Sequence, residues 1–121
     1  MFIHQTETDL TQLPVVKRLP GKVFSKDVGA NQVRVIVTNK GNRVTLTGTV
    51  RAYIKKPDGT MIDMTGSRDS NIARVVLPSE AYEQEGMLGI YLRIEDSGKV
   101  ITLGGVEGYC YKSRTNDLVY D

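Results

Sequence analysis

The chain has 121 residues and a mass of 13.4 kDa, the size of one ordinary domain, and its apolar and charged fractions are typical of globular proteins. One cysteine and one histidine exclude an intramolecular disulfide, a cysteine zinc cage and a multi-histidine metal site, and they argue against Ser-His or Cys-His catalysis. The net charge of +2 is too balanced for a dedicated nucleic-acid binder, which needs a strongly basic face. These counts favour a protein that is not an enzyme and holds no cofactor or metal.

The first 20 residues, MFIHQTETDLTQLPVVKRLP, form a polar and irregular segment. It lacks the basic and apolar regions of a secretory signal, and no apolar run in the chain is long enough to cross a membrane. It is nonetheless richer in apolar residues than a disordered tail. We interpret residues 1–20 as an extended arm that lies against another surface; the alternative is a strand that completes its own domain. The arm residues expected to contact a partner are Phe2, Ile3, Leu10, Leu13, Val15, Val16, Lys17 and Arg18.

Residues 21–121 are predicted to form a β-domain, because apolar residues recur at every second position along several runs. The clearest runs are QVRVIVT, TVRAYIKK and GMLGIYLRIE; NIARVVL, KVITL and VEGYCYK complete the set. The residues expected on the buried faces of the main runs are Val33, Val35, Val37, Val50, Ala52, Ile54, Ala73, Val75, Leu77, Leu88, Ile90, Leu92 and Ile94.

Three turns separate these runs and follow one pattern, in which a turn-forming residue precedes a glycine. They are predicted hairpin turns, and their sequences are Asn39-Lys40-Gly41, Pro57-Asp58-Gly59 and Asp96-Ser97-Gly98.

The segment PSEAYEQEG interrupts the alternation. Ser79 is suited to cap a single helical turn and Gly86 to end it, so we expect a short helical crossover between two sheets. Seven or eight short strands fit an all-β, immunoglobulin-like antiparallel sandwich. The competing fold is a five-stranded barrel of the oligonucleotide-binding type, and the strand count favours the sandwich.

Catalytic or metal-binding motifs are weak throughout. The loop aspartates Asp58, Asp63 and Asp69 match no EF-hand spacing and are best explained as turn and cap residues. An acidic cluster of Glu80, Glu83 and Glu85 fits a solvated helical turn. The pair Gly104-Gly105 indicates a bend or bulge, and Cys110 is expected to be a buried structural thiol.

Tyr53 and Tyr91 fall on the solvent-facing sides of their predicted strands, near Arg51, Lys55 and Arg93. Three interpretations remain open at this point. The tyrosines and cations form a protein contact, they bind an oligosaccharide or single-stranded nucleic acid, or they are cross-strand pairs that stabilise an exposed sheet face.

The charges are unevenly distributed along the chain. Residues 1–60 carry ten Lys or Arg and four Asp or Glu, whereas residues 61–121 carry six and ten. This uneven distribution is explained either by chance or by a protein with one basic side, which packs against an acidic neighbouring protein.

The order of these motifs resembles the N-terminal domain of phage baseplate upper proteins and related phage head-fibre proteins. The resemblance covers roughly residues 20–117. Four motifs support the resemblance. They are Val33–Thr38 with Val44-Thr45-Leu46-Thr47-Gly48, Val50–Lys56 with Pro57-Asp58-Gly59, Val75-Val76-Leu77-Pro78 with Gly86, and Leu88–Ile94 with Asp96-Ser97-Gly98.

This resemblance implies an immunoglobulin-like virion module, assembled in the host cytoplasm, that docks on a major capsid protein or on a baseplate or tail protein. It implies trimers or other homo-oligomers, no catalytic residues, no nucleic acid and no membrane. Relatives usually continue into a linker and stalk, whereas this chain ends soon after Thr115-Asn116-Asp117. We therefore expect a docking or decorating module that uses its arm and a sheet face.

Overall fold

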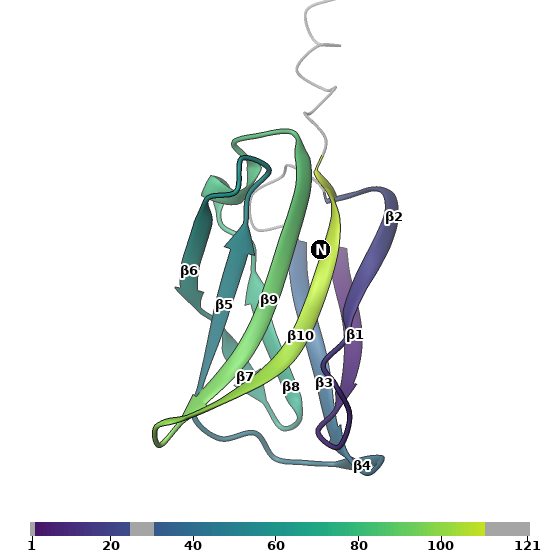
Figure 1. The fold of residues 1–121 in the computed structure, drawn as a ribbon, viewed down its shortest axis with the longest axis vertical. Helices are drawn as coiled ribbons and strands as arrows, with labels where there is room; N and C mark the ends of the chain where they lie inside the picture. Colours follow the sequence, from purple (N-terminus) through teal and green to yellow (C-terminus); the bar gives the residue numbers. More distant parts are fainter. Residues whose placement is uncertain (1, 25–30, 111–121) are drawn as a thin grey trace, which may run out of the picture.

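A computed structural model describes residues 2–24 and 31–110. These residues form an all-β sandwich of two sheets with one 3-10 turn, as the sequence predicted (Figure 1). Met1 of the expected arm and the last residues of the expected final strand, Tyr111 and Lys112, lie outside the described residues. The elements are β1 (Phe2–Asp9), β2 (Val16–Phe24), β3 (Asn31–Asn39), β4 (Asn42–Arg43), β5 (Thr49–Lys55), β6 (Met61–Thr65), β7 (Ser67–Asp69), β8 (Ile72–Val76), η1 (Ser79–Tyr82), β9 (Gly86–Asp96) and β10 (Lys99–Cys110).

The first sheet has the strand order β1-β3-β8-β7, with β4 paired to β3. The second sheet has the order β2-β10-β9-β5-β6. Most neighbouring strands are antiparallel, but β1 runs parallel to β3 and β2 runs parallel to β10. Both sheets are therefore mixed, which differs from the purely antiparallel sandwich that the hairpin turns predicted. A tight hairpin can join only antiparallel strands. No hairpin connects β1 to β3 or β2 to β10, so these two pairs are free to be parallel.

The core lies between the two sheets and includes all the residues that alternation assigned to the buried faces, together with others such as Phe24, Leu103 and Val106. Each of the main strands contributes every second side chain, which is the period of a strand with one dry face. The largest side chains with essentially no exposure are Ile54, Leu77, Leu88, Ile90, Leu92 and Leu103. Cys110 is also buried, as predicted.

The N-terminal segment is extended, but it belongs to the domain itself. Residues 2–9 pair with β3, and residues 16–24 pair with β10, so the segment contributes one edge strand to each sheet (Figure 1). This corrects the interpretation of a separate arm in favour of the alternative, a strand that completes its own domain. Pro20 is compatible with β2 because an edge strand leaves backbone positions without a ladder partner.

The three predicted turns are present, with positive φ angles of 81°, 89° and 80° at Gly41, Gly59 and Gly98. The predicted bulge is also present, because the β9–β10 register shifts between Thr102 and Gly104. The crossover joins the two sheets as expected, but the capping prediction was wrong. Pro78 occupies the N-cap position of η1, and the Ser79 hydroxyl donates to the Glu80 carboxylate instead.

The charge difference between the two halves of the chain does not become a difference between two faces. Strand β3 from the basic half pairs with β8 from the acidic half, and β5 likewise pairs with β9. Each sheet therefore mixes residues of both halves.

Candidate docking surfaces

Tyr53 and Tyr91 occupy directly opposed positions on β5 and β9, on the outer side of the second sheet. The Arg93 guanidinium lies 4.4 Å from the centroid of the Tyr53 ring, a cation–π distance. Two residues further along the same strands, and on the same face, Arg51 lies opposite Arg93. We call these four residues, Tyr53, Tyr91, Arg51 and Arg93, the tyrosine face. Two predicted arm residues lie beside it, because Val16 pairs with Gly105 and Arg18 pairs with Glu107 in β10.

Glycines shape the floor of this face. The Tyr91 ring lies over Gly89, where any Cβ would collide with it. Gly105 is opposite Tyr91 and leaves no room for a side chain against the Ile90 backbone. Two hollows lie on this face, of about 220 Å³ beside Tyr53 and Tyr91 and about 430 Å³ between Tyr91 and the turn that contains Pro57. Partial burial, with a contribution from the Glu107 carboxylate, raises the pKa of the Tyr91 phenol.

Most cations on this face have carboxylate partners. Arg51 binds Asp63 and the Thr65 hydroxyl, and Arg93 binds Glu95 at 2.9 Å. Arg18 reaches Glu107 at 3.4 Å. Binding to a phosphate backbone requires cations that are not already neutralised, so this pairing disfavours the nucleic-acid interpretation. The tyrosines form the predicted cross-strand pair.

A second group of exposed apolar side chains gathers at the end of the sandwich where the β1–β2 connection lies. We call Leu10, Leu13, Val15 and Ile101 the apolar end. Leu13 is 87% exposed, and the others are between 40% and 52% exposed. Leu10 and Ile101 line a hollow of about 120 Å³ whose other walls come from residues 44–47, Ile94, Asp96 and Leu103.

The remaining predicted contact residues lie elsewhere. Phe2 and Ile3 are exposed at the start of β1, in the first sheet. The Lys17 ammonium donates to the Gln5 carbonyl at 3.5 Å and so covers part of the β1 edge. The structure therefore divides the predicted contact residues between several surfaces and does not gather them into one arm.

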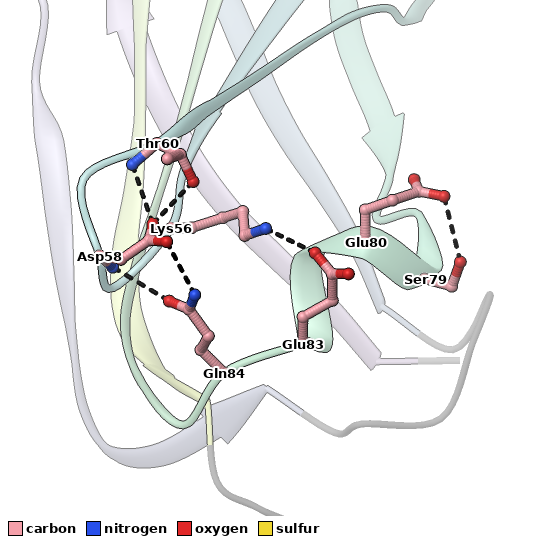
Figure 2. A network of polar contacts seen from close by, with 7 residues as sticks. All are labelled: Lys56, Asp58, Thr60, Ser79, Glu80, Glu83 and Gln84. Carbon is pink, nitrogen blue, oxygen red and sulfur yellow. Dashed lines mark hydrogen bonds and ion pairs between the residues drawn. The ribbon is translucent and has the colours of Figure 1, made fainter.

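Asp58, one of the three loop aspartates, and Glu83 of the acidic cluster have structural roles (Figure 2). Asp58 accepts hydrogen bonds from the backbone N–H and hydroxyl of Thr60 and from the Gln84 amide, and its own N–H donates to Gln84. Lys56 binds Glu83 at 2.5 Å. These contacts fasten the β5–β6 turn to the segment after η1. Within the described part of the chain, no group of three or more His, Cys, Asp or Glu side chains could hold a metal ion.

Asp9 anchors the end of β1 in a similar way, and sequence reasoning missed it. Its carboxylate accepts hydrogen bonds from Thr11 and Thr38 and from the backbone N–H groups of Lys40 and Gly41. The hydrogen bonds, led by that from the Thr11 hydroxyl, hold the pKa of Asp9 well below its ordinary value. The only sequence signal was the Asp-x-Thr spacing, which is common in turns.

The single histidine also has a structural position. His4 Nε2 lies 3.1 Å from the Asn31 side-chain oxygen, and its ring meets Phe24 edge to face at 4.7 Å. Asn31 in turn donates to the buried Tyr82 hydroxyl. No helix in residues 2–24 and 31–110 is long and apolar enough to span a bilayer.

The described residues thus define an immunoglobulin-like β-sandwich. Its candidate functional features are two exposed surfaces, the tyrosine face and the apolar end. Comparison by sequence finds no matching protein-family profile and no matching curated protein. Among solved structures, the chain is similar to the N-terminal domain of ORF48 of phage TP901-1, with a TM-score of 0.60 and 14% identity. The match covers 93% of this chain and 100% of that one. At this identity, the similarity establishes a shared fold.

Proposed function

We propose that this protein is a non-enzymatic structural component of a bacteriophage particle, a docking or decorating module of a head fibre or baseplate. The observation that carries the proposal is the fold shared over 93% of the chain with the N-terminal domain of a phage protein. The motif order described above points to the same class independently of the coordinates.

The proposed attachment uses the apolar end and the tyrosine face. Exposed apolar groups such as Leu13 release water when a partner covers them, at about 25 cal/mol per Å² of apolar area. Tyrosine and arginine are enriched among residues that dominate protein interfaces. Partners of this module are other phage structural proteins, namely a major capsid protein or a baseplate or tail protein, and the module acts as a homo-oligomer.

The particle itself provides the first test. An antibody raised against the purified chain is used to probe density-gradient fractions of a lysate from the host in which the gene is expressed and particles form. We expect the chain to sediment with intact particles after washing in moderate salt. Recovery of all the chain in the soluble fractions, while particles are abundant, would contradict the proposal.

The apolar end is tested by Leu13→Asp, because this side chain is almost fully exposed and its replacement does not disturb the core. We expect the variant to fold normally and to lose most of its incorporation into particles. The matched control is Met61→Asp, which changes another exposed apolar residue on the edge strand β6. Equal incorporation of both variants would exclude the apolar end as the attachment surface.

A further inference from the structure

Each sheet carries one pair of arginines that face each other directly across neighbouring strands. On the second sheet, Arg51 of β5 is opposite Arg93 of β9. On the first sheet, Arg34 of β3 is opposite Arg74 of β8. All four side chains point outward, because their neighbours in sequence are buried. Like charges in directly opposed positions destabilise a sheet unless something offsets them.

The pair on the second sheet is offset within the molecule. Arg51 has the Asp63 carboxylate, and Arg93 has the Glu95 carboxylate at 2.9 Å. Arg93 also lies against the Tyr53 ring. Each guanidinium therefore has its own source of negative potential.

The pair on the first sheet has weaker compensation, because only Arg74 has a carboxylate partner and its contact is long. Arg34 Nε donates to the neutral Gln32 amide at 2.5 Å, and Arg74 Nε donates to the neutral Ser67 hydroxyl at 3.2 Å. The nearest carboxylate to Arg74 is Asp69, at 4.0 Å and largely exposed. No carboxylate of the described residues lies within 4.0 Å of Arg34.

The rows of paired positions on both sides of this arginine pair contain aliphatic side chains, together with Gln32 in one row and Glu7 and Asp69 at the ends of the other. One row of paired positions places Ile3 and Val76 next to Gln32, and both are substantially exposed. The next row beyond the arginines pairs Ile36 with Ile72, which are both half-buried. We call these residues together the arginine face: Arg34, Arg74, Ile3, Ile36, Ile72 and Val76.

We propose that the arginine face is a second docking surface, and that its partner is a protein surface that places an Asp or Glu carboxylate between Arg34 and Arg74. A carboxylate there accepts charge-assisted hydrogen bonds from both guanidinium groups and removes their mutual repulsion. The neighbouring aliphatic side chains exclude part of the water around it, which strengthens the charged contact. This surface is on the opposite side of the sandwich from the tyrosine face, so the proposal does not depend on which protein covers the latter.

The first test compares two matched variants of the isolated chain, Arg34→Gln and Arg51→Gln, by urea denaturation. Glutamine keeps the aliphatic stem and a polar end but removes the charge. We expect Arg34→Gln to leave the midpoint unchanged or to raise it, because it relieves repulsion at the cost of one hydrogen bond to a neutral acceptor. Arg51→Gln should lower it, because it leaves Asp63 without its partner. A loss of stability in Arg34→Gln equal to that in Arg51→Gln would overturn the inference.

The second test measures binding with a defined probe, a soluble peptide of alternating leucine and glutamate, followed by NMR of the arginine Nε–Hε resonances. We expect salt-sensitive shifts at Arg34 and Arg74 that exceed those at Arg51 and Arg93, and roughly tenfold weaker binding in Arg34→Gln or Arg74→Gln. A leucine–glutamine peptide is the control and should produce no such shifts.

Three outcomes of this titration would overturn the proposal. They are equal shifts at both arginine pairs, no shift at Arg34 and Arg74, or equal binding of the leucine–glutamine peptide. A short DNA duplex forms the remaining arm of the experiment. If it shifts Arg34 and Arg74 as strongly as the acidic peptide does, the surface recognises phosphate, and the protein partner is rejected.

Discussion

Asp58 is the residue at which the contacts of the β5–β6 turn converge. Its carboxylate accepts hydrogen bonds from Thr60 within the turn and from Gln84 after η1, 26 residues away in sequence. The sequence predicted the local part, because Pro-Asp-Gly is a turn motif in which aspartate bonds nearby N–H groups. Gln84 was not predictable, since nothing in a glutamine's neighbours identifies a partner that only the folded crossover brings near.

We expect Asp58→Ala to lower the urea midpoint more than Gln84→Ala, because the alanine at 58 removes the Thr60 and Gln84 contacts together. Asp58→Asn should lie between wild type and Asp58→Ala, since its side-chain oxygen still accepts from Thr60. A double-mutant cycle for Asp58 and Gln84 measures their coupling. Additive effects of the two alanine substitutions would show that the contact between them contributes nothing.

The acid stability of the domain depends on carboxylates such as Asp9 and Asp58. Hydrogen bonds from neighbouring threonines are the main cause that holds the pKa of each below the ordinary aspartate value of about 3.8. A lowered folded-state pKa contributes stability that is present above the ordinary value and is lost as the pH falls below it. The free energy of unfolding should therefore decline from about pH 4 downward.

The measurement is the urea midpoint from pH 7 to pH 2 for wild type and for the double variant Asp9→Asn with Asp58→Asn. The difference between the two proteins should be largest near neutral pH and should shrink as the pH falls below 4. A difference that stays constant over this range would show that ionisation of these carboxylates does not stabilise the fold.

At the level of elements, the N-terminal strands show where sequence reasoning stopped. The alternation in β3, β5, β8 and β9 predicted their buried faces, because a strand with one dry face shows its period directly. Strand β1 has no such apolar signal. Its inward positions carry His4, Thr6 and Thr8, and the two threonines are buried. Polar inward residues made this strand look like a separate arm.

Thr8 provides a precise test of the role of β1. Its hydroxyl donates to the Leu103 carbonyl at 2.6 Å and so joins the two sheets through a buried hydrogen bond. Thr8→Val keeps the shape but leaves that carbonyl without this donor, which should cost about 1–3 kcal/mol of unfolding free energy. The measurement is chemical denaturation, and a cost within error of zero would contradict the link between the sheets.

Deletion of residues 1–9 should have a larger effect. It removes β1 entirely and leaves one side of β3 without its ladder. We expect a chain that is largely unfolded or aggregated at 25 °C, as judged by circular dichroism and size-exclusion chromatography. A truncated domain that stays folded with the original midpoint would support the separate arm and contradict the structure.

At the scale of the whole molecule, the sequence predicted the class of fold but not its pairing. Alternation identifies the buried face of a strand, and turn motifs identify hairpins. Both are local properties of the sequence. The parallel pairing of β1 with β3 and of β2 with β10 joins segments without a hairpin between them. The arginine pairs likewise emerge only from the register, because Arg34 and Arg74 are 40 positions apart.

Cys110 reports on opening of the whole sandwich. It is 1% exposed at the end of β10, where its backbone pairs with both Gly86 and Phe24. We expect its thiol to react with a disulfide reagent more than about 100-fold more slowly in the native protein than in urea, because access requires opening of a stable domain. Labelling should speed up in parallel with destabilisation in the Thr8→Val variant. Fast labelling of the native protein would show that this end of the sandwich opens locally.

The position of β2 has a consequence for the order of folding during synthesis. Strand β2 leaves the ribosome well before its partner β10, which is the last strand of the described residues. By contrast, β1 and its partner β3 are separated by only a few tens of residues along the chain. The nascent chain must therefore carry an unpaired β2 until β10 has been made, and the second sheet is completed only at that step. The strands that carry the arginine face have all been made once Val76 has been added, whereas the sheet that carries the tyrosine face is completed only with β10.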